Sequence, residues 1–186
     1  GEYIVGIDIS SERSDQLTFI PFLDKLGESL PAKYENIIAD AGYESEENYS
    51  FIEDNNQIAF IKPSNYEMSK TSKYKNDIGR IENMDYDAEN DLFICQNGKT
   101  LKVDGIKFKK SKTGYESEKT VYACEDCSNC SFKSKCIKGN NSKIPLEERT
   151  KKFETSKKFN RQRKEDLERI ITDEGILLRI NRSIQA

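Results

Sequence analysis

Four cysteines fall within a short polar stretch, and their spacing is typical of a metal site. The segment reads YACEDCSNCSFKSKC and places Cys124, Cys127, Cys130 and Cys136 in a C-x2-C-x2-C-x5-C array. Structural Zn²⁺ sites use four thiolates in a tetrahedral arrangement, and neighbouring lysines stabilise the thiolate form. The array therefore predicts a zinc ion that keeps a weakly apolar segment folded.

Two other interpretations of these cysteines stay open. The triplet spacing is also typical of iron–sulfur ligation, although the proline that usually follows the last cysteine is absent. The thiols could also bind no metal. The fifth cysteine, Cys95, is expected to pack against its neighbours or to have no specific role. The alternative is that it replaces one of the four cysteines as a ligand. Clustered, odd-numbered cysteines indicate a reducing, cytoplasmic location better than a disulfide framework.

A single carboxylate, Asp40, follows a short apolar run in the stretch IIADAGYES. Aspartate and glycine are common turn residues, so a turn is one interpretation. Carboxylate oxygens are also the ligands that Mg²⁺ prefers, so a metal ligand at the end of a strand is the other. The local sequence leaves both open.

Composition limits the chemistry that this chain can perform. It contains no histidine, which excludes Ser-His and Cys-His nucleophile pairs and His-ligated zinc. Residues 1–60 carry 13 acidic and 3 basic side chains, whereas residues 124–186 carry 10 acidic and 15 basic ones. This gradient suits metal binding at one end and a polyanion at the other, or two differently solvated surfaces.

An α/β pattern surrounds Asp40. Strands are expected at residues 2–10, 36–40 and 58–63. The helices between them are expected to start at the caps Thr18 and Ser45, with Pro21 in the first turn of the earlier one. Functional residues of α/β folds gather where strands end, which is the position of Asp40.

The middle of the chain is expected to be a surface loop at residues 64–83 followed by β structure. Asn97-Gly98 is a strong signal for a two-residue hairpin turn. That turn would pair Ile94 with Leu101 and point Phe93 and Cys95 to the opposite face.

Two helices are expected near the C-terminal end. The first is basic and spans roughly residues 151–171, and the second is capped by Asp173, with Ile176, Leu177, Ile180 and Ile184 at helical spacing. Lysine and arginine bind phosphates independently of sequence, so the basic helix is a candidate DNA surface. Its candidate residues are Lys151, Lys152, Lys157, Lys158, Arg161 and Arg163. A solvated helix face is the alternative.

Four blocks of the sequence, in order, resemble bacterial insertion-sequence transposases of the DDE type. They are YIVGIDISSERSDQLTFIPFLDKL, IIADAGYESEENYSFIED, YACEDCSNCSFKSKC and EGILLRINRSIQA. The resemblance implies an α/β (α+β) fold, with an RNase H-like mixed sheet, flanking helices, and an inserted β-hairpin and Cys-rich segment. Residues 1–63 would form the first part of the core, 64–145 the insertion, and 146–186 the helical return to the core.

The resemblance also implies an enzyme that cleaves and joins DNA phosphodiesters with Mg²⁺ or Mn²⁺. Asp40 matches the second catalytic aspartate of the family. The first aspartate would precede Gly1, and the glutamate would follow Ala186 on the helix that includes Arg182. With one carboxylate of three, this chain alone is expected to be inactive, and Asp8 is expected to be structural.

Partners follow from the same resemblance. They are DNA, as transposon ends and target, and a second copy in a full-length homodimer. A membrane is not expected, because no apolar run approaches about 18 residues. The competing function is a non-catalytic, zinc-stabilised DNA-binding or interaction module, whose DNA binding would depend on the cysteines and not on Asp40. A redox or iron–sulfur protein is the third.

Overall fold

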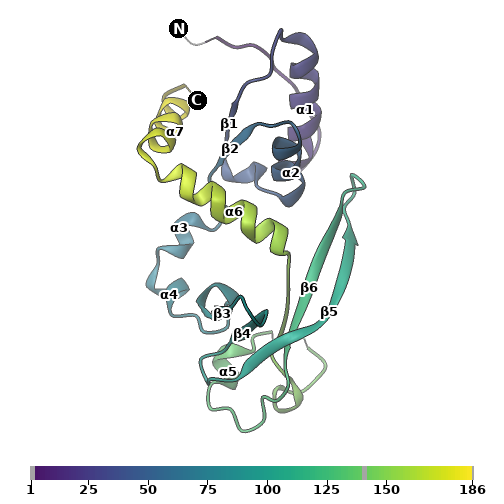
Figure 1. Ribbon diagram of the computed structural model, residues 1–186, viewed down its shortest axis with the longest axis vertical. Coiled ribbons are helices and arrows are strands. Elements are labelled where there is room, and N and C mark those ends of the chain that lie inside the picture. The colour runs from purple at the N-terminus through teal and green to yellow at the C-terminus, as the bar shows by residue number, and fades with distance from the viewer. Residues whose placement is uncertain (1–2, 140–141, 186) are drawn as a thin grey trace. The chain divides into compact units, whose positions relative to one another are not determined.

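The computed structural model describes residues 3–139 and 142–185 and divides the chain into two compact units. The core unit contains residues 1–66, 111–115 and 158–186, and the sheet unit contains residues 67–110 and 116–157. Helices and two separate sheets make this an α+β protein (Figure 1). In the described part of the chain, no helix has both the length and the apolar character that a bilayer crossing requires.

A parallel strand pair forms the centre of the core unit. β1 (Asn36–Ala39) and β2 (Ile58–Ile61) pair in parallel and are joined by α2 (Glu46–Asp54), while α1 (Gln16–Ser29) precedes them. Figure 1 shows both helices beside the strand pair. Parallel strands need a crossover connection, and α2 supplies it. The strand–helix–strand arrangement predicted around Asp40 is therefore confirmed.

The start of α2 follows its sequence signals. The Ser45 hydroxyl accepts a hydrogen bond from the backbone N–H of Asn48 at 3.1 Å, and two glutamates occupy the first turn, where the helix dipole favours negative charge. Tyr49 and Ile52 are 2% and 1% exposed and join the core, together with Phe19 of α1. The predicted cap of α2 is therefore confirmed.

Two predictions for the N-terminal part are wrong. α1 begins at Gln16, so Pro21 lies inside the helix and not in its first turn, and the Thr18 hydroxyl donates to the carbonyl of Asp15 at 2.9 Å. The strand predicted at residues 2–10 does not form over residues 3–10, and Glu2 lies outside the described residues. A strand needs a partner for its peptide groups, and the described residues provide none for this segment. Asp8 instead pairs with Lys25 of α1 at 2.9 Å.

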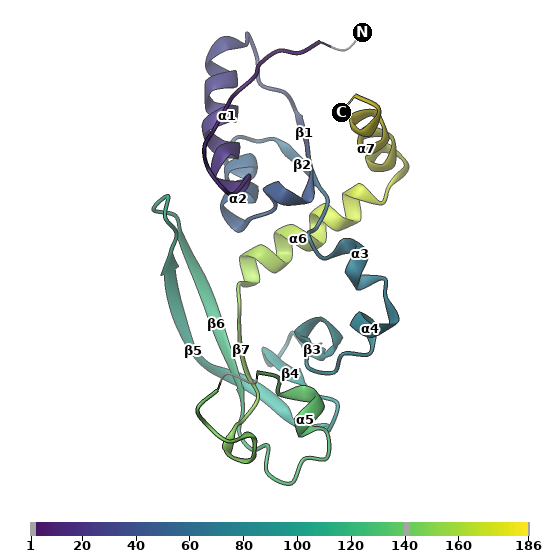
Figure 2. The same cartoon turned by 180° about the vertical axis from the view of Figure 1, so that it is seen from behind.

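The sheet unit is built on one antiparallel sheet with the strand order β3-β4-β5-β6-β7 (Figure 2). Its strands are β3 (Asp85–Asp87), β4 (Leu92–Ile94), β5 (Thr100–Lys110), β6 (Glu116–Cys124) and β7 (Lys152–Thr155). Phe93 packs edge-on against Tyr122 and Phe153, with ring centroids 4.9 and 5.1 Å away. Aromatic packing therefore stabilises this small sheet.

Short helices complete the sheet unit. The segment predicted as a loop contains α3 (Tyr66–Ser69) and α4 (Ser72–Lys75), and the cysteine segment contains α5 (Lys133–Cys136). α4 is capped by the Thr71 hydroxyl, which accepts from the N–H of Tyr74 at 3.3 Å, and Tyr74 is buried. One buried tyrosine was too weak a signal to predict a helix this short.

The hairpin around Asn97-Gly98 forms, but its register differs by one residue from the prediction. Phe93 is opposite Leu101, because the loop has three residues and Cys95 donates to the carbonyl of Lys99 at 2.9 Å. Gly98 adopts a φ of 72°, which such loops require. A one-residue shift turns every side chain to the other face, so Phe93 and Leu101 face the core.

The first of the two C-terminal helices starts later than predicted, and the second has a different cap. α6 (Lys157–Ile170) begins after β7, because residues 152–155 pair with β6. α7 (Asp173–Gln185) is capped by Thr172, whose hydroxyl accepts from the N–H of Gly175 at 3.1 Å, and not by Asp173. A Cβ on Gly175 would lie 2.2 Å from the carbonyl oxygen of Arg169, so only glycine fits this turn. The predicted apolar residues of α7 up to Ile180 are exposed, and the side chain of Ile184 lies outside the described residues.

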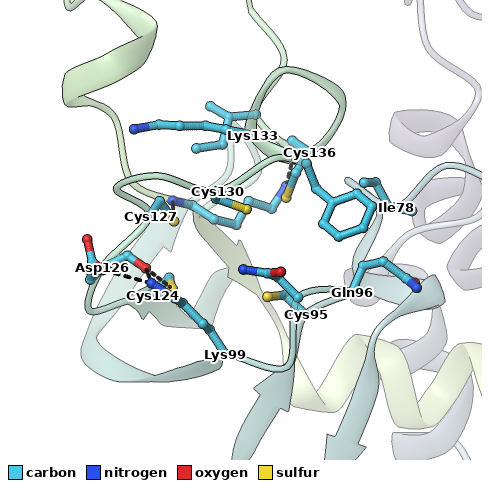
Figure 3. Close-up of a pocket in the computed structure, with 14 residues that line it drawn as sticks. Ile78, Cys95, Gln96, Lys99, Cys124, Asp126, Cys127, Cys130, Lys133 and Cys136 are labelled. Atoms are coloured by element: carbon cyan, nitrogen blue, oxygen red, sulfur yellow. Dashed lines mark hydrogen bonds and ion pairs between the residues drawn. The ribbon is translucent and has the colours of Figure 1, made fainter.

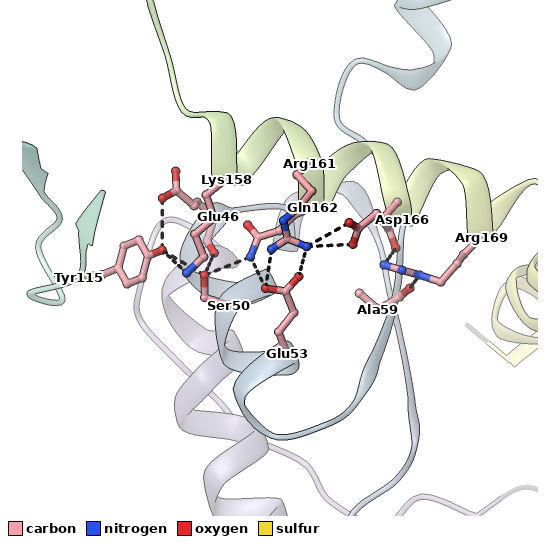
Figure 4. Close-up of polar contacts among 11 residues, drawn as sticks. Glu46, Ser50, Glu53, Ala59, Tyr115, Lys158, Arg161, Gln162, Asp166 and Arg169 are labelled. Carbon is pink, nitrogen blue, oxygen red and sulfur yellow. Dashed lines mark hydrogen bonds and ion pairs between the residues drawn. The ribbon is translucent and has the colours of Figure 1, made fainter. Parts of the chain in front are cut away.

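Side chains of α6 supply hydrogen-bond partners to the backbone of β2, and Figure 4 shows Asp166 and Arg169 of α6 beside Ala59 of that strand. The N–H of Ile61 donates to the Asp166 carboxylate at 3.1 Å, and the Arg169 guanidinium donates to the carbonyl of Ala59 at 3.1 Å. The Tyr49 hydroxyl donates to the other oxygen of Asp166 at 3.0 Å. Asp166 and Arg169 thus replace the acceptor and donor that a third strand would supply.

This arrangement predicts a pH-dependent stability. Burial raises the pKa of Asp166 to about 7, against about 4 in an unfolded chain. Between these values the folded state holds a proton that the unfolded state has lost, so stability falls as pH rises towards 7. Relative to Asp166→Asn, the wild-type free energy of unfolding should decline by about 2 kcal/mol from pH 5 to pH 8. Urea denaturation measures this, and parallel curves for the two proteins would contradict it.

Candidate catalytic turn and cysteine pocket

Asp40 follows β1 directly and begins the 3-10 turn Ala41–Tyr43. Its carboxylate accepts a hydrogen bond from the N–H of Gly42 at 2.9 Å, and the residue is half-buried. The side chain therefore caps a turn at the carboxyl end of a parallel strand. Capping orients a carboxylate at the place where α/β folds gather their functional groups, so the turn role and a ligand role are compatible.

A second carboxylate, Asp15 from the N-terminus of α1, approaches the same turn. A Cβ on Gly42 would lie 2.6 Å from an oxygen of Asp15 and 3.1 Å from an oxygen of Asp40. Both oxygens therefore lie beside one backbone position, which only glycine leaves open. Asp15 was not predicted as a site residue, because an aspartate before a helix is adequately explained as a cap.

The donor chemistry at this turn suits a hard divalent cation, since Mg²⁺ and Mn²⁺ prefer carboxylate oxygens. The number of donors is smaller than such a site uses. Across residues 3–139 and 142–185, no group of three or more His, Cys, Asp or Glu side chains is arranged to hold a metal ion. The turn therefore fits a site for a divalent cation in the type of its donors and in the position of Asp40, but not in the number of donors.

A buried ion pair anchors the segment that follows the turn. The Glu44 side chain is 1% exposed and accepts hydrogen bonds from two nitrogens of Arg163 at 2.6 and 2.8 Å. The N–H of Ser64 donates to the same carboxylate at 2.8 Å, and the Arg163 guanidinium lies over the ring of Phe159. Bidentate pairing fixes geometry as well as charge. The turn of Asp40 is thereby tied to α6.

Three of the six cations predicted to contact DNA are engaged within their own unit. Arg163 holds Glu44, and the ammonium group of Lys151 donates to the carbonyl of Gly79 at 2.6 Å. Arg161 pairs with Glu53 of α2 at 3.0 Å, as Figure 4 shows. These contacts use hydrogen-bond donors that a phosphate would otherwise accept from. A role of these three side chains in DNA binding stays a prediction.

The other three cations are exposed lysines with surface partners. Lys152 pairs with Asp104, and Lys157 pairs with Asp91. Lys158 lies over the ring of Tyr115. Exposed ion pairs contribute little free energy, so these side chains can exchange a carboxylate for a phosphate. Their role in DNA binding also stays a prediction.

All five cysteines line one pocket of the sheet unit (Figure 3). Each has a free thiol. This pocket, which other residues also line, has a volume of about 20 Å³, enough for a single water molecule. The cysteines come from the end of β4, the end of β6, the turn after β6 and the end of α5, as Cys95, Cys124, Cys127, Cys130 and Cys136. The fold thus gathers the predicted array and the fifth cysteine.

Hydrogen bonds and burial shape the chemistry of this cysteine pocket. Burial raises the pKa of the Cys124 thiol to about 11 and also raises the pKa of Cys136. The Cys124 thiol donates to the carbonyl of Asp126 at 3.3 Å, while Cys127 sulfur accepts from the N–H of Lys151 at 3.3 Å. Sulfur donors suit Zn²⁺. In the described residues, however, no three of these thiols are already arranged to hold a metal ion.

Two variants of α6 test whether the Glu44–Arg163 pair anchors the turn that begins at Asp40. Arg163→Met leaves the buried Glu44 carboxylate unpaired and should lower the free energy of unfolding by about 3–5 kcal/mol. Arg161→Met removes an exposed pair and should cost at most about 1 kcal/mol. Urea denaturation measures both, and equal losses would show that Glu44 does not depend on Arg163 in solution.

Comparison with known proteins gives one match. A sequence model of the family described as transposase DDE domain matches residues 94–186, which is half of the chain. The matched part contains the cysteine segment, α6 and α7, while Asp40 precedes it. No curated protein and no solved structure matches the chain. The resemblance found in the sequence is confirmed: the chain belongs to the DDE-domain transposase family.

Proposed function

We propose that this chain contributes to the catalytic domain of a transposase that cleaves and joins DNA phosphodiesters, with Asp40 as a carboxylate ligand of divalent metal ions. The observation that supports Asp40 is its position at the carboxyl end of β1, oriented by the N–H of Gly42. Family membership supports the reaction class and names DNA as the partner. An RNase H-like core built around β1 and β2 is part of this proposal.

Phosphodiester cleavage requires an activated oxygen nucleophile and relief of negative charge on the phosphate. Divalent cations supply both when they are bound between carboxylates and the phosphate. In this chain Asp40 would provide ligand oxygens, and Asp15 would add negative charge beside the same turn. The Glu44–Arg163 pair would keep the turn in place while a ligand binds, because it fixes the backbone four residues after Asp40.

We further propose that Asp40 is one of three catalytic carboxylates and that this chain alone does not cleave DNA. The resemblance to the family supports this, because Asp40 is the one residue of this chain that it matches to the three catalytic carboxylates. An incomplete set of ligands binds a divalent cation weakly, since each missing carboxylate removes charge and coordination. Asp8 is not part of the set, because it pairs with Lys25 on the surface of α1.

The cysteine pocket has a separate role in this proposal. It would hold one structural Zn²⁺ ion through thiolates, which would stabilise a small sheet unit whose aromatic core is limited. Five free thiols also support a reducing, cytoplasmic location.

Asp40→Asn tests the catalytic proposal in the full-length transposase. The amide still accepts the hydrogen bond from Gly42 and so preserves the turn, but it removes the ligand charge. DNA end cleavage should fall by at least about a hundredfold, with DNA affinity unchanged. Cleavage assays and binding titrations measure the two quantities. Asp8→Asn is the matched control and should cleave at the wild-type level.

Full cleavage activity in Asp40→Asn would remove Asp40 from the mechanism. The competing function, a zinc-stabilised DNA-binding module, would then be favoured if DNA binding is salt-sensitive, requires the cysteines and is unchanged by substitution of Asp40.

The exposed lysines give a prediction for DNA binding. Changing Lys152, Lys157 and Lys158 together to glutamine should weaken DNA binding and reduce its salt dependence, because each lost phosphate contact lowers the logarithmic slope by about 0.9. The matched control changes Lys70, Lys73 and Lys75 to glutamine, which alters the net charge equally in another exposed segment. Equal effects from both triple variants would show that net charge alone governs the affinity.

A further inference from the structure

The fifth cysteine, Cys95, shares the pocket with the four cysteines of the predicted array. We infer that Cys95, and not Cys130, completes the zinc site, so that its ligands are Cys95, Cys124, Cys127 and Cys136. This inference rests on the zinc site proposed above. The ligands would then come from three separate segments of the sheet unit, namely the β4–β5 hairpin, the end of β6 with the turn that follows it, and α5.

Cys95, Cys130 and Cys136 are all half-buried and all line the pocket, so what separates Cys95 from Cys130 is the cluster against which each one packs. Cys124 and Cys127 are 5% and 9% exposed and belong to a buried cluster with residues of β4, β5 and β6. Cys95 and Cys136 pack against the same cluster, and Cys130 is not among the described residues that do so. Structural zinc sites are closed to water, with all four ligands supplied by the protein. The four thiols that share one buried cluster are therefore the better set.

The hairpin register explains why Cys95 faces this cluster. Phe93 is opposite Leu101 and points into the core, and alternate residues of a strand share a face. Cys95 lies two residues beyond Phe93, and its N–H continues the ladder to the carbonyl of Lys99 at 2.9 Å. The register predicted from sequence separated Cys95 from the face of Leu101, whereas the observed register places both on the same face.

Polar contacts already tie the hairpin loop to the turn after β6. The ammonium group of Lys99 donates to the carbonyl and the carboxylate of Asp126 at 3.0 and 2.7 Å, which links the loop after Cys95 to the residue between Cys124 and Cys127. Figure 3 shows Lys99 and Cys95 on the same side of the pocket as Cys124. A metal ion would strengthen a connection that exists without it.

The surroundings suit four thiolates on one Zn²⁺ ion. Four thiolates carry more negative charge than the ion neutralises, and Lys99, Lys133 and Lys151 line the pocket. The N–H of Lys151 also donates to the sulfur of Cys127 at 3.3 Å. Such donors stabilise thiolates, and the small volume of the pocket suits one ion better than a cluster.

Metal binding to the full 186-residue chain tests the inference. Zinc per chain is measured after purification, and Co²⁺ is titrated while its thiolate charge-transfer absorption is recorded. Wild type should bind one ion. Cys95→Ser and Cys124→Ser should each weaken Co²⁺ binding by at least about tenfold and reduce the absorption, because each removes a ligand. Cys130→Ser, the matched control, should retain the wild-type affinity and absorption. Far-UV circular dichroism and a second variant, Cys95→Ala, separate loss of a ligand from loss of folding.

The outcomes distinguish this inference from the proposal on which it rests. If wild type binds no stoichiometric metal, the zinc site itself is wrong. If wild type binds one ion and Cys95→Ser binds it equally well, the zinc site stands and the inference is overturned. Loss of binding in Cys130→Ser together with retention in Cys95→Ser would assign the site to the array predicted from sequence.

Discussion

The outer edge of β2 is the constraint on which the core unit depends. A two-stranded parallel pair leaves peptide groups without partners along both sides, and unpaired groups of this kind are costly when buried. α6 meets this requirement on one side, with Asp166 accepting from Ile61 and Arg169 donating to Ala59. Because the same helix carries Arg163, closure of the sheet edge also brings a guanidinium to Glu44, beside the turn that holds Asp40.

The contacts of α6 within the core unit change the interpretation of its positive charge. In the sequence, its lysines and arginines suggest a surface for a polyanion. In the structure, Arg161, Arg163 and Arg169 bind carboxylates or a backbone carbonyl of the core unit. Arginine suits such positions because its planar guanidinium forms several directed hydrogen bonds. The lysines remain exposed, so DNA affinity in the proposed function depends on lysines and fold stability on arginines.

In the sheet unit, the conformation of one glycine influences which residues line the cysteine pocket. Gly98 permits a three-residue loop, and that loop sets the register that brings Phe93 and Cys95 to the buried face. The cysteine segment and the hairpin loop then line one pocket. The local turn thus determines which thiols line the pocket, which the spacing of cysteines along the chain does not reveal.

Local signals in the sequence determined the helix cap at Ser45, the strands around Asp40, the hairpin and the family, because short-range hydrogen bonds and side-chain periodicity suffice for them. They did not determine the hairpin register, the start of α6, the partners of its arginines or the approach of Asp15 and Cys95 to their sites. Those features depend on pairing between residues far apart in the chain, where several alternatives fit the local pattern equally well. Only the assembled tertiary structure selects one of them, since it alone decides which polar groups and sulfur atoms are buried together.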